Sequence, residues 1–75
     1  MLKVGIYDYH QTLFDGVAHR VILPGDYGVF EVLIFHKPLL SLLRKGEIIV
    51  DDVGFPISRG IVRVKDNALV ALVEL

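Results

Sequence analysis

Cysteine and tryptophan are absent from this 75-residue sequence, and methionine occurs once. Without cysteine the chain can form no disulfide, no thiolate nucleophile and no cysteine-ligated zinc site, an absence typical of a reducing compartment. Long apolar runs are also missing, since none approaches the roughly 20 uncharged residues that a membrane helix needs. The first residues lack the charged-then-apolar order of a signal peptide. We therefore expect a soluble, cytoplasmic protein.

The sequence also lacks an excess of charge of either sign. Eight Lys and Arg residues stand against nine Asp and Glu residues, which gives a formal net charge of -1. The basic residues form no cluster along the chain. Because proteins that bind nucleic acid usually carry a basic patch, we expect no nucleic-acid partner.

Apolar residues, by contrast, are abundant and make up 53% of the chain. A chain of this length buries only a little over ~60% of the surface that it exposes when unfolded. We therefore predict one domain over residues 1–75 with marginal stability. Part of its apolar surface should remain for partners or for self-association of the isolated chain.

Short strand patterns follow one another along the whole sequence. Apolar and polar residues alternate from Leu2 to Tyr7 and from Glu47 to Asp52, and Val29 to Phe35 is rich in β-branched and aromatic residues. Turn signals separate these patterns: Asp15-Gly16, Asp26 to Gly28, Lys45-Gly46, Asp52 to Gly54 and Asp66-Asn67. About seven to ten strands without a helix predict an all-β fold, an antiparallel β-sandwich or a barrel.

Four segments carry more specific expectations. Val17 to Leu23 has apolar side chains on both faces and is predicted to be a central strand. Leu39 to Leu43 follows Pro38 and is expected to be extended or to form one short turn. Gly60 is expected to separate two strands. Ala68 to Leu75 is apolar at almost every position, which predicts a strand covered on both faces.

Candidate chemistry is sparse. His10, His19 and His36 lie on separate elements without metal-binding spacing, and no partner suggests His36 as a catalytic base. The adjacent carboxylates Asp51 and Asp52 would need a bent loop to share a cation. Gly25 to Gly28 lacks the Lys-Ser/Thr ending and the helix of a phosphate loop. We expect no catalytic residue, cofactor or metal, and we interpret His36 as a structural or interface residue.

Three stretches of the sequence are LPGDYGVF (23–30), HKPLLSLLRKGEI (36–48) and ISRGIVRVKDNALVAL (57–72). In this order and spacing they together resemble the N-terminal β-sandwich of the epsilon subunit of the rotary F-type ATP synthase. Glu31 and Ile34 stand where the family pattern has glycine and proline, so we expect a less kinked, more strand-like approach to His36. Arg59 replaces another glycine of the pattern. The family's usual C-terminal helical hairpin has no counterpart in the sequence, so we expect no inhibition of ATP hydrolysis by such an arm.

The resemblance implies an antiparallel β-sandwich of two roughly five-stranded sheets in the central stalk. It implies a rotor subunit that docks on the gamma subunit and the c ring, couples proton or sodium flow to ATP synthesis, and has no catalytic site. Through the complex the chain would be peripheral to the inner face of the cell membrane. The implied c-ring contacts are Asp26, Tyr27, Gly28 and Val29, and the implied gamma contacts are His36, Pro38 and Ser41.

Two alternatives remain open at the level of the sequence. A small ligand-binding β-barrel would line a pocket with its apolar surplus, and a self-associating sandwich would pair its exposed strand edges. A pocket needs converging polar groups, and only His19 and His36 are candidates. Strand alternation further predicts that Val29 points outward and Phe30 inward.

Overall fold

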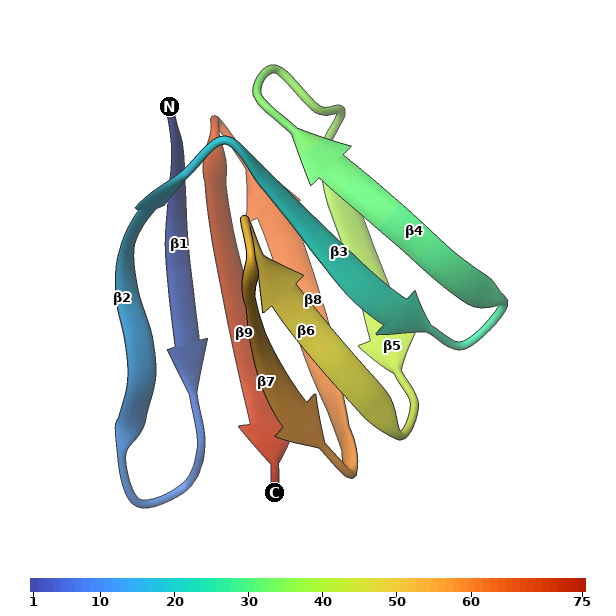
Figure 1. Ribbon diagram of the computed structural model, residues 1–75. Helices are drawn as coiled ribbons and strands as arrows, with labels where there is room; N and C mark the ends of the chain where they lie inside the picture. The colour runs from blue at the N-terminus through green and yellow to red at the C-terminus, as the bar shows by residue number, and fades with distance from the viewer.

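The computed structural model describes residues 1–75 and consists of nine β-strands without a helix. No helix capable of crossing a membrane is present. The strands form two facing layers, β2-β1-β9-β8-β5 and β4-β3-β6-β7, joined where Gly25 pairs with Leu43 (Figure 1). Their bounds are β1 Leu2–Tyr7, β2 Thr12–Ala18, β3 Arg20–Gly25, β4 Gly28–Leu33, β5 Leu39–Leu43, β6 Gly46–Val50, β7 Val53–Ile57, β8 Arg59–Lys65 and β9 Ala68–Glu74. The predicted β-sandwich is confirmed, with layers of five and four strands.

Neighbouring strands run antiparallel with one exception. β1 and β9 pair in parallel, with Lys3 opposite Ala68 and Tyr7 opposite Leu72. All other strand pairs are antiparallel, as predicted, so this parallel pair is the one departure from the predicted antiparallel sandwich. Parallel neighbours need a long connection, and here almost the entire chain lies between the two strands.

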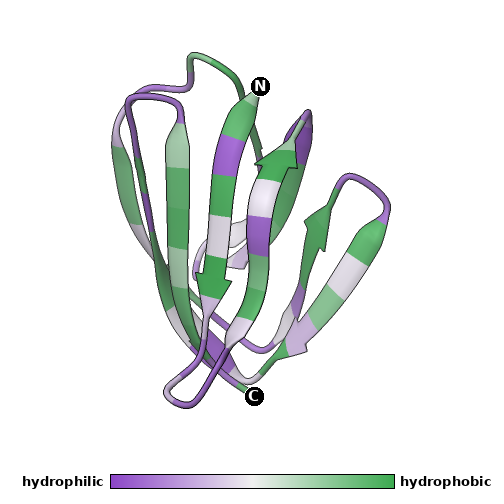
Figure 2. Ribbon diagram, turned by 90° about the vertical axis from the view of Figure 1, so that its left-hand side faces the viewer, coloured by the Kyte–Doolittle hydropathy of each residue, from purple (hydrophilic) through white to green (hydrophobic).

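Sixteen buried apolar residues form the core between the layers. Strand alternation places them there, as in β1, where Leu2, Val4 and Ile6 are buried. Phe14 of β2 and Phe55 of β7, on edge strands of the two layers, meet edge to face with ring centroids 5.8 Å apart. Hydrophobic colours follow the strands and hydrophilic colours most of the turns (Figure 2). No polar or charged side chain is buried in this core.

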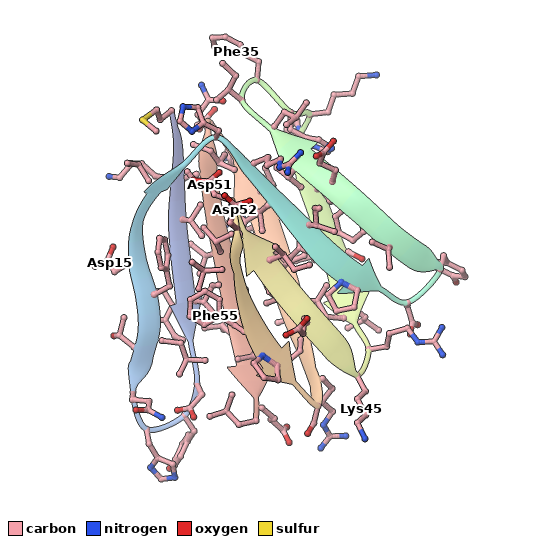
Figure 3. All side chains as sticks on the ribbon, in the orientation of Figure 1. Asp15, Phe35, Lys45, Asp51, Asp52 and Phe55 are labelled. Carbon is pink, nitrogen blue, oxygen red and sulfur yellow. The ribbon has the colours of Figure 1, made fainter.

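The predicted turn at Asp15-Gly16 is wrong. Both residues lie inside β2, where Asp15 pairs with Gly5 and Gly16 pairs with Val4. Neither residue has a positive φ, which the hairpin turn signalled by Asp-Gly requires. Asp15 points away from the sheet toward solvent (Figure 3). Uninterrupted pairing with β1 has overridden the local turn preference.

The chain instead bends at His19, where it crosses from one layer to the other. The carboxylate of Asp51 holds this corner, because its Oδ1 accepts hydrogen bonds from the backbone N–H groups of His19 at 3.0 Å and Arg20 at 3.2 Å. The predicted single strand from Val17 to Leu23 is therefore divided between β2 and β3. Its second half is central as predicted, because β3 pairs with β4 and β6.

Two strand boundaries also differ from the prediction. Ser58, and not Gly60, separates β7 from β8, because Gly60 pairs with Leu43 on one side and Val73 on the other. A Cβ at position 60 would lie 2.7 Å from the carbonyl oxygen of Leu72, so the packing requires glycine there. The turn after β6 occupies Asp51 and Asp52, ahead of the predicted span from Asp52 to Gly54.

Two hairpins confirm their predicted turns. Asp66 and Asn67, with φ of 53° and 60°, form a two-residue loop between Lys65 and Ala68. Asp26 and Tyr27 connect β3 to β4, and Gly28 follows with a φ of 131°, which strongly favours glycine. The segment after Pro38 is extended, as β5.

Candidate docking surface

The outer face of β5, β8 and β9 is apolar. Five of its side chains are between 36% and 69% exposed: Leu40, Leu42, Ile61, Val70 and Leu72. Strand pairing aligns three of them in one row, because Leu42 lies opposite Ile61 and Ile61 opposite Leu72. We call these five residues the apolar face.

The apolar face corrects the prediction for the last strand. Leu69, Ala71 and Val73 of β9 are buried, but Val70 and Leu72 are exposed on the outer side. β9 is thus covered on one face in this chain. The unbroken apolar run of its sequence reflects a second apolar surface that no other part of the chain covers.

A shallow hollow lies at one end of the apolar face, where β9 meets β1. Tyr7 lies opposite Leu72 and extends the row of apolar side chains. Its ring lies over Gly5, since a Cβ at that position would be 2.5 Å from the tyrosine oxygen. Arg59 and Glu74 line the same hollow and form an ion pair at 3.1 Å. The hollow is mainly apolar with a charged margin.

Asp8 lines the hollow from the β1–β2 loop. Its carboxylate accepts hydrogen bonds from the backbone N–H groups of His10 and, at 2.9 Å, Gln11. These bonds lower the pKa of Asp8, with the bond from His10 as the largest cause. The loop therefore holds an ionised carboxylate beside the apolar face.

The other end of this sheet is basic. Lys65 and Lys3 both lie opposite Ala68, and Arg63 separates Leu40 from Val70 in the neighbouring row. None of these three basic side chains forms an ion pair. A partner that covers the apolar face would meet positive charge at this margin.

The four predicted c-ring residues, Asp26, Tyr27, Gly28 and Val29, lie together at the β3–β4 hairpin and are all exposed. Val29 is 73% exposed, whereas Phe30 packs against the core, which confirms the predicted facing of the pair. The Phe30 ring lies against Gly25, where a Cβ would be 2.7 Å from the ring.

The three predicted gamma residues are not all brought together. His36 and Pro38 lie in the β4–β5 loop, at the far end of β4 from the hairpin, whereas Ser41 lies within β5. Ser41 is half-buried, and its neighbours Leu40 and Leu42 are the residues of β5 that belong to the apolar face. Leu42 accepts a hydrogen bond from the Asp26 N–H at 3.1 Å, so β5 links the two predicted contact regions.

The approach to His36 is more bent than predicted. β4 ends at Leu33, and Phe35 has a φ of 61°, in the left-handed region. The absence of the family's glycine and proline therefore does not make this segment a strand. His36 Nδ1 lies 2.7 Å from the carbonyl oxygen of Lys37, which accepts a bond from it when that nitrogen carries the proton.

Sequence reasoning missed the apolar face as a site. The available signal was β9 itself, in which both alternating sets of side chains are apolar. The histidines form no cluster in the structure, and no group of three or more His, Cys, Asp or Glu side chains is placed to hold a metal. His19 is exposed and lies 4.0 Å from the Asp51 carboxylate.

Comparison with solved structures supports the fold. The chain superimposes on a chain from the central stalk and c ring of the Tetrahymena thermophila mitochondrial ATP synthase with a TM-score of 0.81. The match covers 99% of this chain and 63% of that chain at 20% identity. At this identity the likeness shows a shared fold.

Sequence comparison is more specific. The ATP synthase epsilon chain of a Nitratiruptor species is 37% identical over 97% of this chain and 60% of its own length. That of a Sulfurovum species is 32% identical over 99% of this chain and 62% of its own. The chain thus spans about three fifths of the length of these relatives. The family model for the ATP synthase delta/epsilon chain β-sandwich domain matches residues 1–74, and the chain belongs to that family.

Proposed function

We propose that this chain is a non-catalytic rotor subunit in the central stalk of an F-type ATP synthase. It docks on the gamma subunit and the c ring and couples proton or sodium flow through the membrane to ATP synthesis. Family membership and the names of the epsilon-chain relatives support this role. As part of the complex, the chain lies at the cytoplasmic, inner face of the cell membrane.

The apolar face is the observation that carries the proposal. A domain of 75 residues that leaves five large apolar side chains on one sheet surface needs a protein partner to cover them. Permanent interfaces are more apolar than transient ones and resemble a protein core. We place the gamma subunit on this face, with His36 and Pro38 at its margin.

The β3–β4 hairpin supplies the second contact. Asp26, Tyr27 and Val29 project from a turn that is held to β5 by a hydrogen bond from Asp26 N–H to the Leu42 carbonyl at 3.1 Å. A second bond, from Arg44 N–H just after β5 to the Pro24 carbonyl of β3 at 2.8 Å, holds the strand that leads into the turn. A loop fixed in this way loses little conformational freedom on binding. We place the c ring at this hairpin, so that one rigid domain connects the ring to gamma.

Sedimentation velocity of the full chain, alone and with the purified gamma subunit, tests this function. The expected result is a stable complex with gamma and self-association of the chain when gamma is absent. A monodisperse chain that ignores gamma would contradict the proposal. Leu72→Asp should weaken binding to gamma by about thirtyfold, whereas Glu47→Gln on the opposite layer should leave it unchanged.

A further inference from the structure

The tip of the β4–β5 loop carries an exposed aromatic residue with a left-handed backbone conformation. Phe35 is 81% exposed, and its φ of 61° lies in the left-handed region, which is strained for a side chain with a Cβ. Leu33 and Ile34 beside it are also exposed. Figure 3 shows Phe35 at the outermost point of this loop, beyond the ends of the strands.

The strain does not serve the fold of the isolated chain. Phe35 contributes neither to the core nor to the apolar residues packed against it. A glycine at this position would adopt the same φ without strain and would expose no ring to water. Residues with such strained backbone cluster at active sites, ligand clamps and switch regions.

A second residue, distant in sequence, fixes the loop. The Phe35 N–H donates a hydrogen bond to the side-chain Oδ1 of Asn67, which lies in the β8–β9 turn. Asn67 is itself held, because it has a φ of 60° and its carbonyl oxygen accepts a bond from the Lys3 N–H at 2.9 Å. Three segments therefore meet at Asn67, and together they hold the backbone of Phe35 in place.

We propose that Phe35 is an aromatic anchor that inserts into an apolar recess of the gamma subunit, and that Asn67 is the positioning residue that presents it. This inference rests on the proposed function and names a contact within it. The loop continues through His36 and Pro38 to Leu40, so the anchor is continuous with the apolar face. Buried aromatic side chains in pockets commonly dominate the binding energy of such interfaces.

Calorimetric titration of the full chain with gamma, beside thermal melts, tests the anchor. Phe35→Gly should weaken binding by about tenfold or more, while its melting temperature stays equal or rises because the strain is relieved. Val53→Gly is the control, since Val53 is also exposed and follows the turn between β6 and β7, on the layer opposite the apolar face. It should leave the affinity for gamma unchanged.

Two substitutions at Asn67 test the positioning role. Asn67→Gly tolerates the left-handed backbone but removes the acceptor, and should weaken binding by about threefold, less than loss of the ring itself. Asn67→Asp keeps Oδ1 as an acceptor and should restore the affinity. If both variants bind like the parent chain, Asn67 has no positioning role.

The outcomes separate this inference from the function on which it rests. If Leu72→Asp weakens binding but Phe35→Gly binds like the parent chain, the anchor is wrong and the stalk function stands. If Phe35→Gly alters only self-association of the chain, the ring serves a contact between copies, which also overturns the inference. If the parent chain does not bind gamma, both proposals fail.

Discussion

The outer faces of the two layers differ in kind. On the β4-β3-β6-β7 layer, Arg20 and Glu31 approach to 3.8 Å, and the Glu47 carboxylate lies over Gly54. The apolar residues between them, Ile22 and Ile49, are half-buried. On the other layer, the five residues of the apolar face stand exposed in neighbouring rows.

This difference shows that the two layers treat their outer apolar side chains differently: one covers them with charged side chains, and the other leaves them exposed. Charged side chains with long apolar stems can cover isoleucines and keep one face hydrated. The row of Leu42, Ile61 and Leu72 contains no charged side chain. Arg59 and Glu74 lie beyond one end of the apolar face, and at the other end Arg63 stands between Leu40 and Val70, with Lys3 and Lys65 beyond it. On the charged layer the exposed apolar side chains Val29, Leu33 and Val53 belong to its edge strands β4 and β7, whereas the apolar face extends over three neighbouring strands.

The largest effect is expected where a charge enters the core. Phe30→Asp should destabilise the fold by about 3 kcal/mol or more, because it buries an unpaired carboxylate and removes a packed ring. Val29→Asp, one residue away and exposed, should change stability by less than about 0.5 kcal/mol. It should instead weaken the coupling of ion flow to ATP synthesis in the assembled complex. Denaturant melts and proton-pumping assays compare the two variants.

Equal melting points for Val29→Asp and Phe30→Asp would contradict the different environments of the two side chains. If neither variant changes coupling, the β3–β4 hairpin is not the ring contact.

The next effect separates the two outer faces. Leu72→Asp at the centre of the apolar face should cost about 2 kcal/mol or more in binding to gamma, roughly a thirtyfold loss of affinity. Its effect on folding should be small, because the side chain is already exposed. Glu47→Gln on the charged face should change neither quantity. Titration calorimetry and thermal melts measure both, and similar binding losses on the two faces would remove the distinction.

A smaller effect is expected at the corner that joins the layers. Asp51→Ala removes the acceptor of the His19 and Arg20 N–H groups and leaves alanine at a φ of 52°. We expect a loss of about 1–3 kcal/mol in the free energy of unfolding. Asp51→Asn keeps an acceptor and tolerates the backbone, so it should lose much less. An equal loss in both would mean that the charge, and not the hydrogen bonds, holds the corner.

The smallest effect is a dependence on pH beside the apolar face. Hydrogen bonds lower the pKa of Asp8 below its ordinary value of 3.8, so the ionised form stabilises the folded state. This contribution is complete above that value and is lost as the pH falls through the lower pKa of the folded chain. Urea melts across this range should show Asp8→Asn losing less stability on acidification than the parent. Asp15→Asn, at an exposed carboxylate without such hydrogen bonds, should follow the parent.

Local patterns predicted most strands but not how they meet. Alternation identified β1 and β6 and the facing of Val29 and Phe30, because these strands bury one face and expose the other. Asp15-Gly16 misled because its turn preference is weak beside continuous pairing with β1. The corner at His19 and the bond between Phe35 and Asn67 join residues more than 30 positions apart, and no local pattern reports them.

Of the two proposed contact surfaces, the sequence predicted the one that is local in the chain and missed the one that is assembled from distant strands. The hairpin from Asp26 to Val29 is local and was found as one exposed unit. The apolar face is assembled from three strands, and only their register places Leu42, Ile61 and Leu72 side by side. In the sequence, an uncovered apolar strand face and a buried one look the same.

Methyl NMR with a soluble paramagnetic probe can compare the two outer faces in one sample. The full chain would be labelled at its Leu, Ile and Val methyl groups and observed before and after addition of the gamma subunit. We predict that the methyl groups of Leu42, Ile61 and Leu72 lose their contact with the probe when gamma binds, while Ile22 and Ile49 are unaffected. Protection of Ile22 and Ile49 instead, with the apolar face still open to the probe, would contradict the account.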